Sequence, residues 1–432
     1  MKIEEFIDEE YREYATYVLQ SRAIPNLIDG LKPSQRKILY TALKTAKNNP
    51  IKTASLSGNC IYQANYHHGD ASLNAAISAM AADWNNNLPL LDGIGNFGSR
   101  LVNAPAAARY TLVQVSKNFE RFFVDNDILE TAYDPEDPEP NFYLPLIPWI
   151  LVNGIRGIAI GFASEIQPRD PKAIIGACKA YLKSGRIAND IPPHFESFKG
   201  AITWDKKTLK HVAHGRYDLS GLTLTIDEIP PGIERETYVK HLNKLEDSGF
   251  ISSFIDESQD GYKFVIRLPN KTKLSHDQIM SKFKLLKNLN ENLTVIDENG
   301  KLKVFQSAIE ILKHFCDYRV KIYDRRFKYY IKRDQQEVDR LSERLRFIQL
   351  VVDGKLKFTN KTKKDLKDEL INKRSFNKGY IPDLMEVKTY HFCDDEIQSI
   401  KERISDLEKD LIQWKNAVPK DVFIAELTKM RL

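Results

Sequence analysis

Apolar residues recur at alternating steps of three and four in two segments of the C-terminal third of the chain. The first segment opens at Ser307, whose spacing to Glu310 is typical of a capping box. Such steps place apolar side chains on one helical face, so the pattern predicts two long helices. The repeated residues are Val338, Leu341, Leu345, Ile348 and Val352, then Ile397, Ile400, Ile404, Leu407, Leu411 and Trp414.

A lysine-rich connection, Lys355 to Lys378, separates these two helices. It allows the second helix to fold back along the first, so we predict an antiparallel coiled coil. An ordinary helical hairpin fits the same pattern. We interpret the lysines as solvated rather than as a DNA contact, because a run of charge usually faces water.

Two runs in the middle of the chain alternate apolar and polar residues, as half-buried strands do. They are residues 222–226 and 262–268, and a helix-like segment at 238–245 lies between them. The segments before residue 163 are mainly helical in pattern. The predicted fold class is therefore helix-rich α+β, with regions at 1–163, 164–305 and 306–432.

Two other patterns suggest functions that we do not favour. The apolar stretch from Leu144 to Ala163 is about as long as a membrane span, but its prolines, its glycines and Arg156 indicate a buried strand with tight turns in a soluble domain. Residues 93–98 satisfy G-x-G-x-x-G. Because Pro105 and an alanine run follow where a long helix should begin, a dinucleotide site is not expected.

The formal net charge is only +5 over 432 residues, so any nucleic-acid surface must be a local patch. This length suffices for two or three domains, each with its own core. The first ten residues are acidic, whereas Lys32, Arg36 and Lys37 stand beside the helix-like Ile38-Leu39-Tyr40. The contrast suits a basic helix that faces DNA phosphates. A solvated basic face would have the same pattern.

Four cysteines stand far apart, and none belongs to a C-x-x-C pair. This spacing argues against a zinc site and a disulfide framework, and it favours a reducing, cytoplasmic setting. The N-terminal residues lack the basic head and apolar core of a signal peptide, so secretion is not expected. The cysteines are Cys60, Cys178, Cys316 and Cys393.

The dipeptide Arg109-Tyr110 places a permanent cation beside a phenol. A tyrosyl oxygen is a poor nucleophile at neutral pH because its ordinary pKa is about 10. Attack on a phosphate therefore needs groups that take up the proton and neutralise phosphate charge. Pro105 favours a turn that lets both side chains reach one phosphate. On its own, an Arg-Tyr pair is more often a surface feature without a catalytic role.

Several motifs flank this dipeptide. They are Arg22-Ala23-Ile24-Pro25, the run from Asp29 to Tyr40, Tyr66-His67-His68-Gly69-Asp70, Gly95-Asn96-Phe97-Gly98-Ser99-Arg100, the run from Glu139 to Pro148, and the run from Leu151 to Gly161. Their order resembles the DNA breakage-reunion region of type IIA DNA topoisomerases, the cleavage core of gyrase A and topoisomerase II. Matches at Asp227-Glu228-Ile229-Pro230, Asp256-Glu257-Ser258 and Pro419-Lys420-Asp421 extend the resemblance over nearly the whole chain.

The resemblance implies three domains. They are a winged-helix (helix-turn-helix) breakage-reunion domain at 1–163, whose winged helix ends near Tyr133, a DNA-bending tower domain at 164–305, and a coiled coil that ends in a helical dimer gate, the C-gate, at 306–432. Within the family, the short chain and the Tyr-His-His-Gly motif bring it nearest to the medium subunits of T4-like bacteriophages.

The resemblance also implies roles for single residues in cleavage. Tyr110 matches the nucleophile that attacks a DNA phosphodiester and holds the 5′ phosphate. Arg109 and Arg22 match the cations that grip the scissile phosphate, and His68 matches a histidine that assists there. An alternative metal cluster of His67, His68 and Asp70 is disfavoured, because neighbouring histidines rarely converge on one ion and no fourth ligand is evident.

Other matched residues concern DNA binding. Lys32 and Arg36 match residues that grip the DNA backbone, and Lys37 belongs to the same basic run. Ile158 matches an apolar wedge that enters between base pairs and bends the duplex. Outside the frame Gly157-Ile158-x-x-Gly161, Ile158 would be read as ordinary core.

The sequence contains no ATPase motif of the family and no recognisable match to its metal-binding module. We therefore expect Mg²⁺ and ATP on one or two partner subunits, with this chain acting on double-stranded DNA as a homodimer joined at the C-gate. No wrapping domain follows Pro419-Lys420-Asp421. The expected outcome is relaxation, decatenation or unknotting, not supercoiling, during phage replication in the cytoplasm of a bacterial host.

Ala71 and Ala75 occupy the positions at which gyrase anchors fluoroquinolones, so poor sensitivity to these drugs is expected. Two rival functions follow from the same sequence. A tyrosine recombinase would link Tyr110 to a 3′ end without a partner metal. A non-catalytic DNA-bending scaffold would use the same three domains with an inactive tyrosine.

Overall fold

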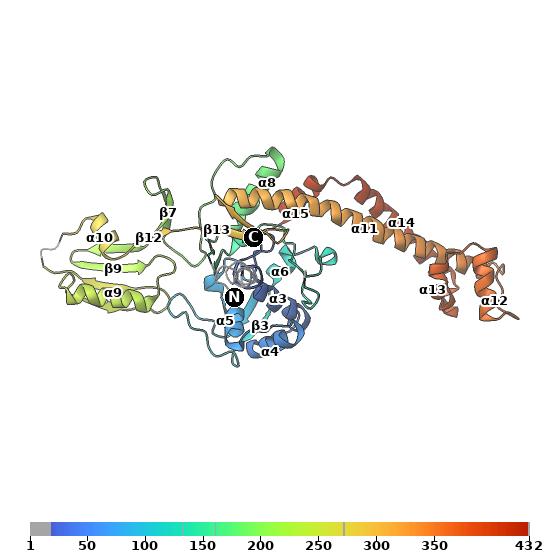
Figure 1. Cartoon of the computed structure of the whole chain (residues 1–432), viewed down its shortest axis with the longest axis horizontal. Helices are drawn as coiled ribbons and strands as arrows, with labels where there is room; N and C mark the ends of the chain where they lie inside the picture. The colour runs from blue at the N-terminus through green and yellow to red at the C-terminus, as the bar shows by residue number, and fades with distance from the viewer. Residues whose placement is uncertain (1–18, 133, 160, 271–272, 431–432) are drawn as a thin grey trace, which may run out of the picture. The chain divides into compact units, whose positions relative to one another are not determined.

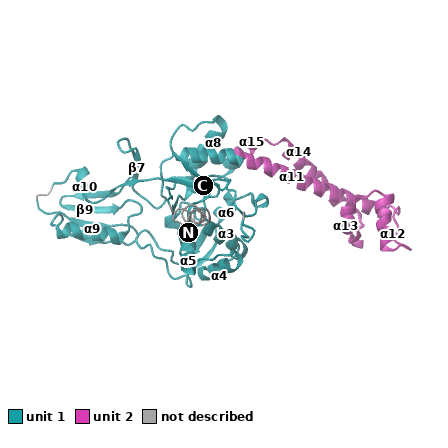
Figure 2. Ribbon diagram, in the orientation of Figure 1, with its two compact units in different colours: residues 1–319, 426–432 teal, residues 320–425 magenta. Residues whose placement is uncertain are grey.

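The computed structural model of the chain describes residues 19–132, 134–159, 161–270 and 273–430. Residues 320–425 form one compact unit, and the rest of the described chain forms the other (Figure 2). The acidic first ten residues and Tyr133 lie outside the described residues. The three predicted domain boundaries stay predictions.

Three helices, α3 (Pro33–Thr45), α4 (Thr53–Gln63) and α5 (Asp70–Ala81), pack beside a small antiparallel sheet (Figure 1). Pro33 supplies a fixed φ at the start of α3, where the Gln35 side chain accepts a hydrogen bond from the Lys32 amide (2.9 Å). The sheet has the order β1 (Ile51–Lys52), β3 (Leu112–Val115), β2 (Leu91–Ile94). These are the parts that a winged helix needs, and that assignment stays a prediction. The shorter helices here are η2 (Leu19–Ala23), η3 (Asp83–Asn85), α6 (Lys117–Phe122) and η4 (Asn126–Ile128).

The apolar stretch at 144–163 is buried from Leu144 to Val152, and it contains the short helix α7 (Trp149–Val152) and the strand β4 (Ile155–Ile158), which pairs with β5 (Ala163–Ile166). Gly154, with φ of +63°, makes the turn between α7 and β4. A strand and a tight turn are present as predicted, but the strand is not the buried part. Arg156 and Ile158 of β4 are exposed, whereas the buried residues 144–152 end in the helix α7, which was not predicted. Among the described residues, no helix has both the length and the apolar character that a membrane crossing requires.

The middle of the chain holds α8 (Pro171–Ser184) and then a series of short strands with two helices. These elements are β6 (Ala201–Asp205), β7 (Lys210–His214), β8 (Arg216–Ser220), β9 (Thr223–Glu228), α9 (Arg235–Asp247), β10 (Ser253–Asp256), β11 (Phe264–Arg267), α10 (His276–Lys282), β12 (Leu286–Leu289), β13 (Leu293–Ile296) and β14 (Leu302–Phe305). The strands predicted at 222–226 and 262–268 are confirmed as β9 and β11, and the helix at 238–245 as part of α9.

Two antiparallel sheets organise this region, with orders β10–β11–β9–β8 and β12–β7–β6, while β13 pairs with β14. In the larger sheet, Val265 of β11 pairs with Thr225 of β9. The alternate residues of these strands enter one apolar core with side chains of α9 and α10, including Leu224, Tyr238 and Phe264. We refer to residues 195–290, which carry both sheets, as the sheet region.

A single helix, α11 (Ala308–Val352), runs for 45 residues. It begins where predicted, because the Ser307 hydroxyl accepts a hydrogen bond from the Glu310 amide (3.3 Å). After it come α12 (Lys363–Asp368), η5 (Glu369–Lys373), η6 (Lys378–Tyr380), α13 (Ile381–Met385), η7 (Thr389–His391), α14 (Asp394–Asn416) and α15 (Pro419–Lys429).

Within residues 320–425, α14 runs antiparallel to α11. Arg344 pairs with Glu396 near the start of α14 (2.8 Å), whereas Tyr330 contacts Trp414 near its end (5.2 Å between ring centroids). The two-helix pairing agrees with the prediction. One apolar cluster unites the predicted residues Val338, Leu341, Leu345, Ile348, Ile397, Ile400, Ile404, Leu407 and Leu411. Val352 is instead exposed, at 47%.

The lysine-rich connection forms a small core of its own. Leu366, Leu370, Phe376 and Leu384 are buried and belong to one cluster with Phe347 of α11. The lysines themselves are exposed, as interpreted. The short helices between them were not predicted, because their apolar residues are few and irregularly spaced among charges.

Candidate functional site

Tyr110 lies in a turn that is held from both sides by the start of α4. The Ala108 carbonyl accepts a hydrogen bond from the Ala54 amide (3.2 Å), and the Thr111 carbonyl accepts one from the Thr53 amide (3.0 Å). The hydroxyls of Thr53 and Thr111 are also paired, at 2.8 Å, in buried surroundings. The turn that Pro105 suggested is therefore present, and it is tied to a helix rather than left as a free loop.

The turn presents the Tyr110 phenol to solvent. Its side chain is 70% exposed, and the Arg109 guanidinium lies over the ring, 4.6 Å from the centroid. Both side chains thus reach the same side of the backbone, which neighbouring residues of a helix cannot do. A phosphate that approaches the Tyr110 hydroxyl meets the Arg109 cation as well.

Arg22 and His68 form a second group. Arg22 is exposed within η2, and His68 is partly buried between α4 and α5. Burial lowers the pKa of His68, and the positive charges of Arg22 and His67 lower this pKa further. The two predicted residues therefore lie within electrostatic reach of each other. In the described part of the chain, no hydrogen bond, ion pair or ring contact joins them to the Tyr110 turn.

Gly157 brings β4 against the backbone that follows Arg22. A Cβ atom at Gly157 would lie 2.1 Å from the Ala23 carbonyl oxygen and 3.6 Å from Cε of Lys32, so only glycine permits this approach. The neighbouring Ile158 side chain is 72% exposed, which excludes the reading of Ile158 as ordinary core. The structure thus brings the backbones of Ala23 and Gly157, the neighbours of Arg22 and Ile158, together, with Lys32 alongside.

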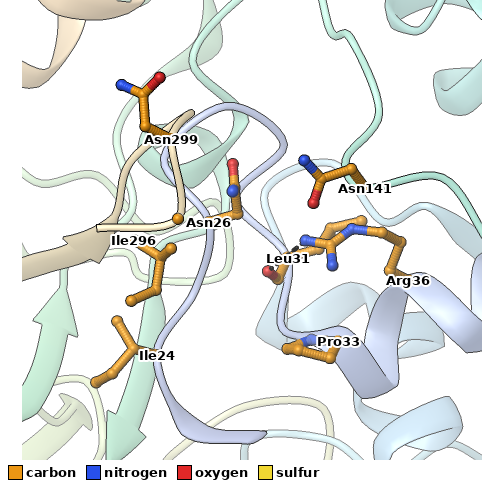
Figure 3. Close-up of a pocket in the computed structure, with 9 residues that line it drawn as sticks. Ile24, Asn26, Leu31, Pro33, Arg36, Asn141, Ile296 and Asn299 are labelled. Atoms are coloured by element: carbon orange, nitrogen blue, oxygen red, sulfur yellow. Dashed lines mark hydrogen bonds between the residues drawn. The ribbon is translucent and has the colours of Figure 1, made fainter. Parts of the chain in front are cut away.

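This N-terminal segment also lines a pocket of about 310 Å³ (Figure 3). Asn26 and Ile296 face each other across a parallel bridge, in which the Leu27 amide donates to the Ile296 carbonyl (2.8 Å) and the Ile296 amide donates to the Pro25 carbonyl (2.9 Å). The segment after Arg22 is therefore fixed on β13, far along the sequence. In Figure 3 the Arg36 guanidinium lies beside Leu31 on the pocket wall.

The structure corrects the expectation that Arg36 and Lys37 face DNA. Arg36 is 7% exposed and donates from Nε to the Asp29 carboxylate (2.8 Å). Lys37 is 9% exposed, and its Nζ pairs with Asp137 (2.5 Å) and Glu139 (2.9 Å). Both cations form ion pairs. Arg36 is paired with the buried Asp29, and Lys37 is paired with the buried Glu139 and the partly exposed Asp137. These ion pairs stabilise the fold, so Arg36 and Lys37 are not candidate DNA contacts.

Lys32, by contrast, lines a cleft of about 600 Å³ together with Arg100, Arg156 and Lys287. Burial lowers the pKa of the Lys32 ammonium. Burial also lowers the pKa of Lys287, with Glu165 and Arg156 acting in opposite directions. Because Arg100 is paired with the buried Glu228, the cations of this cleft that can attract a polyanion are Lys32, Arg156 and Lys287.

The sequence analysis missed Arg156 and Lys287 as cleft residues. For Arg156 a signal existed, because it stands two positions before Ile158 on a strand and so shares its face. For Lys287 there was none, since its place in the cleft follows from the pairing of β12 with β7.

The carboxylates and imidazoles do not assemble a metal site in the described part of the chain. No three His, Cys, Asp or Glu side chains among the described residues are grouped closely enough to hold an ion. His67, His68 and Asp70 are not such a group. These residues therefore do not form a site for a divalent cation.

Comparisons with known proteins agree with this geometry. The profile of the family that comprises the A subunits of DNA gyrase and topoisomerase IV matches residues 22–432. The DNA topoisomerase medium subunit of Enterobacteria phage T4 is 34% identical over 99% of this chain and 97% of its own length. The mitochondrial DNA topoisomerase 2 of Dictyostelium discoideum is also 34% identical, over 99% of this chain but only 35% of its own.

A solved structure gives the same result at the level of the fold. The crystal structure of the Plasmodium falciparum topoisomerase II DNA-binding, cleavage and re-ligation domain superposes with a TM-score of 0.88 at 28% identity, covering 98% of this chain and 63% of that one. The resemblance inferred from the motif order is thereby confirmed. The chain belongs to the family of DNA gyrase and topoisomerase IV A subunits, and it corresponds to the DNA cleavage-reunion subunit of a type II topoisomerase.

Proposed function

We propose that Tyr110 is the nucleophile with which this chain opens DNA. Its Oη attacks the scissile phosphorus, the bond to the 3′ oxygen breaks, and the 5′ phosphate stays on the tyrosine. The phenol loses its proton and the 3′ oxygen gains one, so reversal reseals the strand without ATP. The observation that carries the proposal is the 70% exposed Tyr110 phenol, held in a bonded turn with Arg109 over its ring.

Two arginines and a histidine assist in this proposal. Arg109 neutralises charge on the phosphate that Tyr110 attacks, where the transition state carries extra negative charge. Arg22 and His68 lie in the second group, which has no bond to the Tyr110 turn. We infer that the DNA backbone itself joins the two groups, with Arg22 and the neutral His68 imidazole holding phosphate oxygens.

Lys32 and Ile158 bind the duplex beside these groups. Lys32 contacts the backbone at the mouth of the cleft, a contact that gives affinity rather than sequence choice. Ile158 is the wedge, and its 72% exposure leaves it free to enter between base pairs. Unstacking costs a few kcal/mol per step but lets a bent duplex contact more protein.

The cofactors of the reaction belong, in our proposal, to partner chains. The resemblance implies Mg²⁺ and ATP, and the described residues offer no group that would hold a metal ion. The T4 relative is itself named a medium subunit, which implies further subunits in that enzyme. We place the metal-binding and ATPase modules on one or two such partners.

The domains at 1–163, 164–305 and 306–432 then act as breakage-reunion domain, tower and C-gate of a homodimer. The assembled enzyme relaxes, decatenates or unknots double-stranded DNA by passing one duplex through a transient break in another. We propose that this activity serves phage replication in the cytoplasm of a bacterial host, a proposal that the likeness to a phage protein supports.

The test is a denaturing gel of end-labelled duplex DNA with the purified chain and Mg²⁺, with and without partner subunits. We expect a partner-dependent 5′-linked adduct that disappears in Tyr110→Phe and persists in Tyr62→Phe, since Tyr62 is an even more exposed phenol (88%) outside the turn. A 3′-linked adduct would indicate a recombinase. No adduct under any condition, with DNA bending retained, would indicate the scaffold, which the family membership does not favour.

A further inference from the structure

Arg100 ties the loop that ends in Tyr110 to the sheet region. Its guanidinium donates to the Ser197 carbonyl (2.8 Å) and to the Ile229 carbonyl (2.9 Å), and it pairs with the Glu228 carboxylate (2.8 Å). The Arg100 side chain is 16% exposed and that of Glu228 only 3%. These partners lie about one hundred or more positions further along the chain, so the contact is a tertiary clamp.

The clamp also uses the backbone and the neighbours of Arg100. The Tyr262 hydroxyl donates to the Arg100 carbonyl (2.7 Å), and the guanidinium lies near the rings of Tyr262 (5.2 Å) and Phe198 (5.6 Å). Leu101 packs against the apolar core of the sheet region. Side chain, main chain and the next residue all hold the same point of the loop.

Glu228 is fixed independently of Arg100. Its carboxylate accepts hydrogen bonds from the Lys199 amide (2.9 Å) and the Ile229 amide (3.1 Å). It stands at the end of β9, in the centre of the larger sheet. Because the Glu228 carboxylate is held in place by these amides, a displacement of the sheet also moves Arg100.

Close packing and hydrogen bonds also hold the loop around Arg100 and Tyr110. The loop folds on itself where Gly98, with φ of +82°, comes so near Asn103 that a Cβ atom would lie 2.6 Å from its carbonyl oxygen. Further on, the Ala106 amide donates to the Asn96 carbonyl (2.9 Å), and the Tyr110 amide donates to the Ala107 carbonyl (2.8 Å). The segment between the clamp and the nucleophile is thus a bonded loop and not a slack tether.

We propose that Arg100 is a positioning residue, which sets the placement of Tyr110 according to how the sheet region engages DNA. The inference rests on the proposed role of Tyr110. Arg100 itself contacts two carbonyls and a carboxylate. Its charge is therefore neutralised within the protein and contributes little to DNA affinity. The sheet region, when it binds a bent duplex, carries the loop through Glu228 and Arg100 and brings the phenol to the phosphate.

The experiment uses the holoenzyme with its partner subunits and compares Arg100→Ala, Arg100→Lys and Tyr262→Phe with the native chain. DNA affinity is measured by fluorescence anisotropy in a Tyr110→Phe background. The single-turnover rate of phosphotyrosyl formation is measured at saturating DNA. Tyr262→Phe removes only the hydroxyl that bonds the Arg100 carbonyl, so it keeps the fold.

We expect Arg100→Ala to slow cleavage at saturation at least tenfold with less than a twofold change in Kd. Arg100→Lys should recover part of the rate, and Tyr262→Phe should lower it by a few fold. The matched control is Arg216→Ala, which breaks an exposed ion pair with Asp227 in the same sheet and leaves the loop untouched. Both its rate and its Kd should equal those of the native chain.

Three results would overturn the inference. A Kd raised tenfold with normal cleavage at saturation would make Arg100 a DNA contact. Unchanged rate and Kd would remove any role for the clamp. Equal losses in Arg100→Ala and Arg216→Ala would indicate a general effect on the sheet. The native holoenzyme is assayed first. If it forms no Tyr110-dependent adduct, the proposed function itself is wrong, and this result is distinct from a failure of the Arg100 variants.

Discussion

The Asp29 carboxylate holds the Arg36 guanidinium through two hydrogen bonds, Nε to Oδ2 at 2.8 Å and Nη2 to Oδ1 at 3.1 Å, with both side chains buried. The same carboxylate accepts the amides of Leu31 (3.0 Å) and Tyr143 (3.1 Å). One acid therefore joins the entry of α3 to a segment more than a hundred residues away.

Removing that acid should destabilise the fold. Asp29→Ala leaves a buried, unpaired guanidinium, a change that typically costs about 3–5 kcal/mol. We expect urea denaturation to show this loss in the free energy of unfolding. Asp227→Ala, which frees the exposed Arg216, should cost less than about 1 kcal/mol. Equal midpoints for the two variants would show that the buried pair does not stabilise the domain.

Lys32→Ala should weaken DNA binding without unfolding the protein. Loss of one phosphate contact lowers the slope of log affinity against log salt by about 1. The control is Lys44→Ala, an exposed lysine in the last turn of the same helix. Salt titrations of duplex binding compare the two, and an unchanged slope for Lys32→Ala would place this ammonium away from the phosphates.

Ile158→Ala should reduce DNA bending and leave stability unchanged, because a side chain that is 72% exposed contributes little to the core. Energy transfer between dyes at the two ends of a bound duplex measures the bend. Ile255→Ala, at 61% exposure on β10, is the matched variant and should bend DNA normally. The wedge role is lost if both variants bend DNA as the native chain does.

Gly157→Ala should disrupt cleavage more than its single methyl suggests. The new Cβ meets the Ala23 carbonyl oxygen at 2.1 Å, so β4 and the Arg22 segment must separate. Gly176→Ala in α8 has no atom within 4 Å of the new Cβ, and it should stabilise the protein by about 0.5–1 kcal/mol. Thermal melting and adduct formation are measured for both, and wild-type adduct levels in Gly157→Ala would contradict the expectation.

The titration of His68 should depend on Arg22. Burial first, then the charges of Arg22 and His67, keep the pKa of His68 below 6.5, so the ring is neutral at pH 7. Arg22→Gln removes one positive charge, which makes protonation easier and should raise the midpoint. Imidazole NMR signals followed through pH 5–8 test this.

The internal reference for that titration is His241. Burial lowers its pKa, and the nearby cations are Lys244 and Lys284 rather than Arg22. Its midpoint should stay where it is in Arg22→Gln. A shift of equal size in both imidazoles would indicate a general change of the protein and not the local field of Arg22.

Much of the fold followed from the sequence because its signals are local. The alternation at 222–226 and the three-four steps at 397–411 report which face of an element is buried, and both elements are present. The turn at Tyr110 followed from Pro105. The resemblance supplied what periodicity does not, namely which tyrosine among nineteen deserves a chemical role.

The roles of charged residues could not be predicted in the same way. Arg36 and Lys37 read as a basic face, but their charge is neutralised by Asp29, Asp137 and Glu139, which only the folded chain brings near. Arg100 was visible as the last residue of a glycine-rich motif, yet its partners lie far along the chain. A sequence shows a charge and does not show its counter-ion.

The double attachment of the Tyr110 turn to Thr53 and Ala54 has a consequence for fidelity. If Tyr110 holds the 5′ phosphate as proposed, the broken end is anchored to a fixed point on a folded domain. Its freedom is limited to the rotations of one aromatic side chain, so the severed 3′ hydroxyl finds its old partner at high local concentration. The fixed position of the turn would then limit rejoining to the wrong end, without a separate proofreading step.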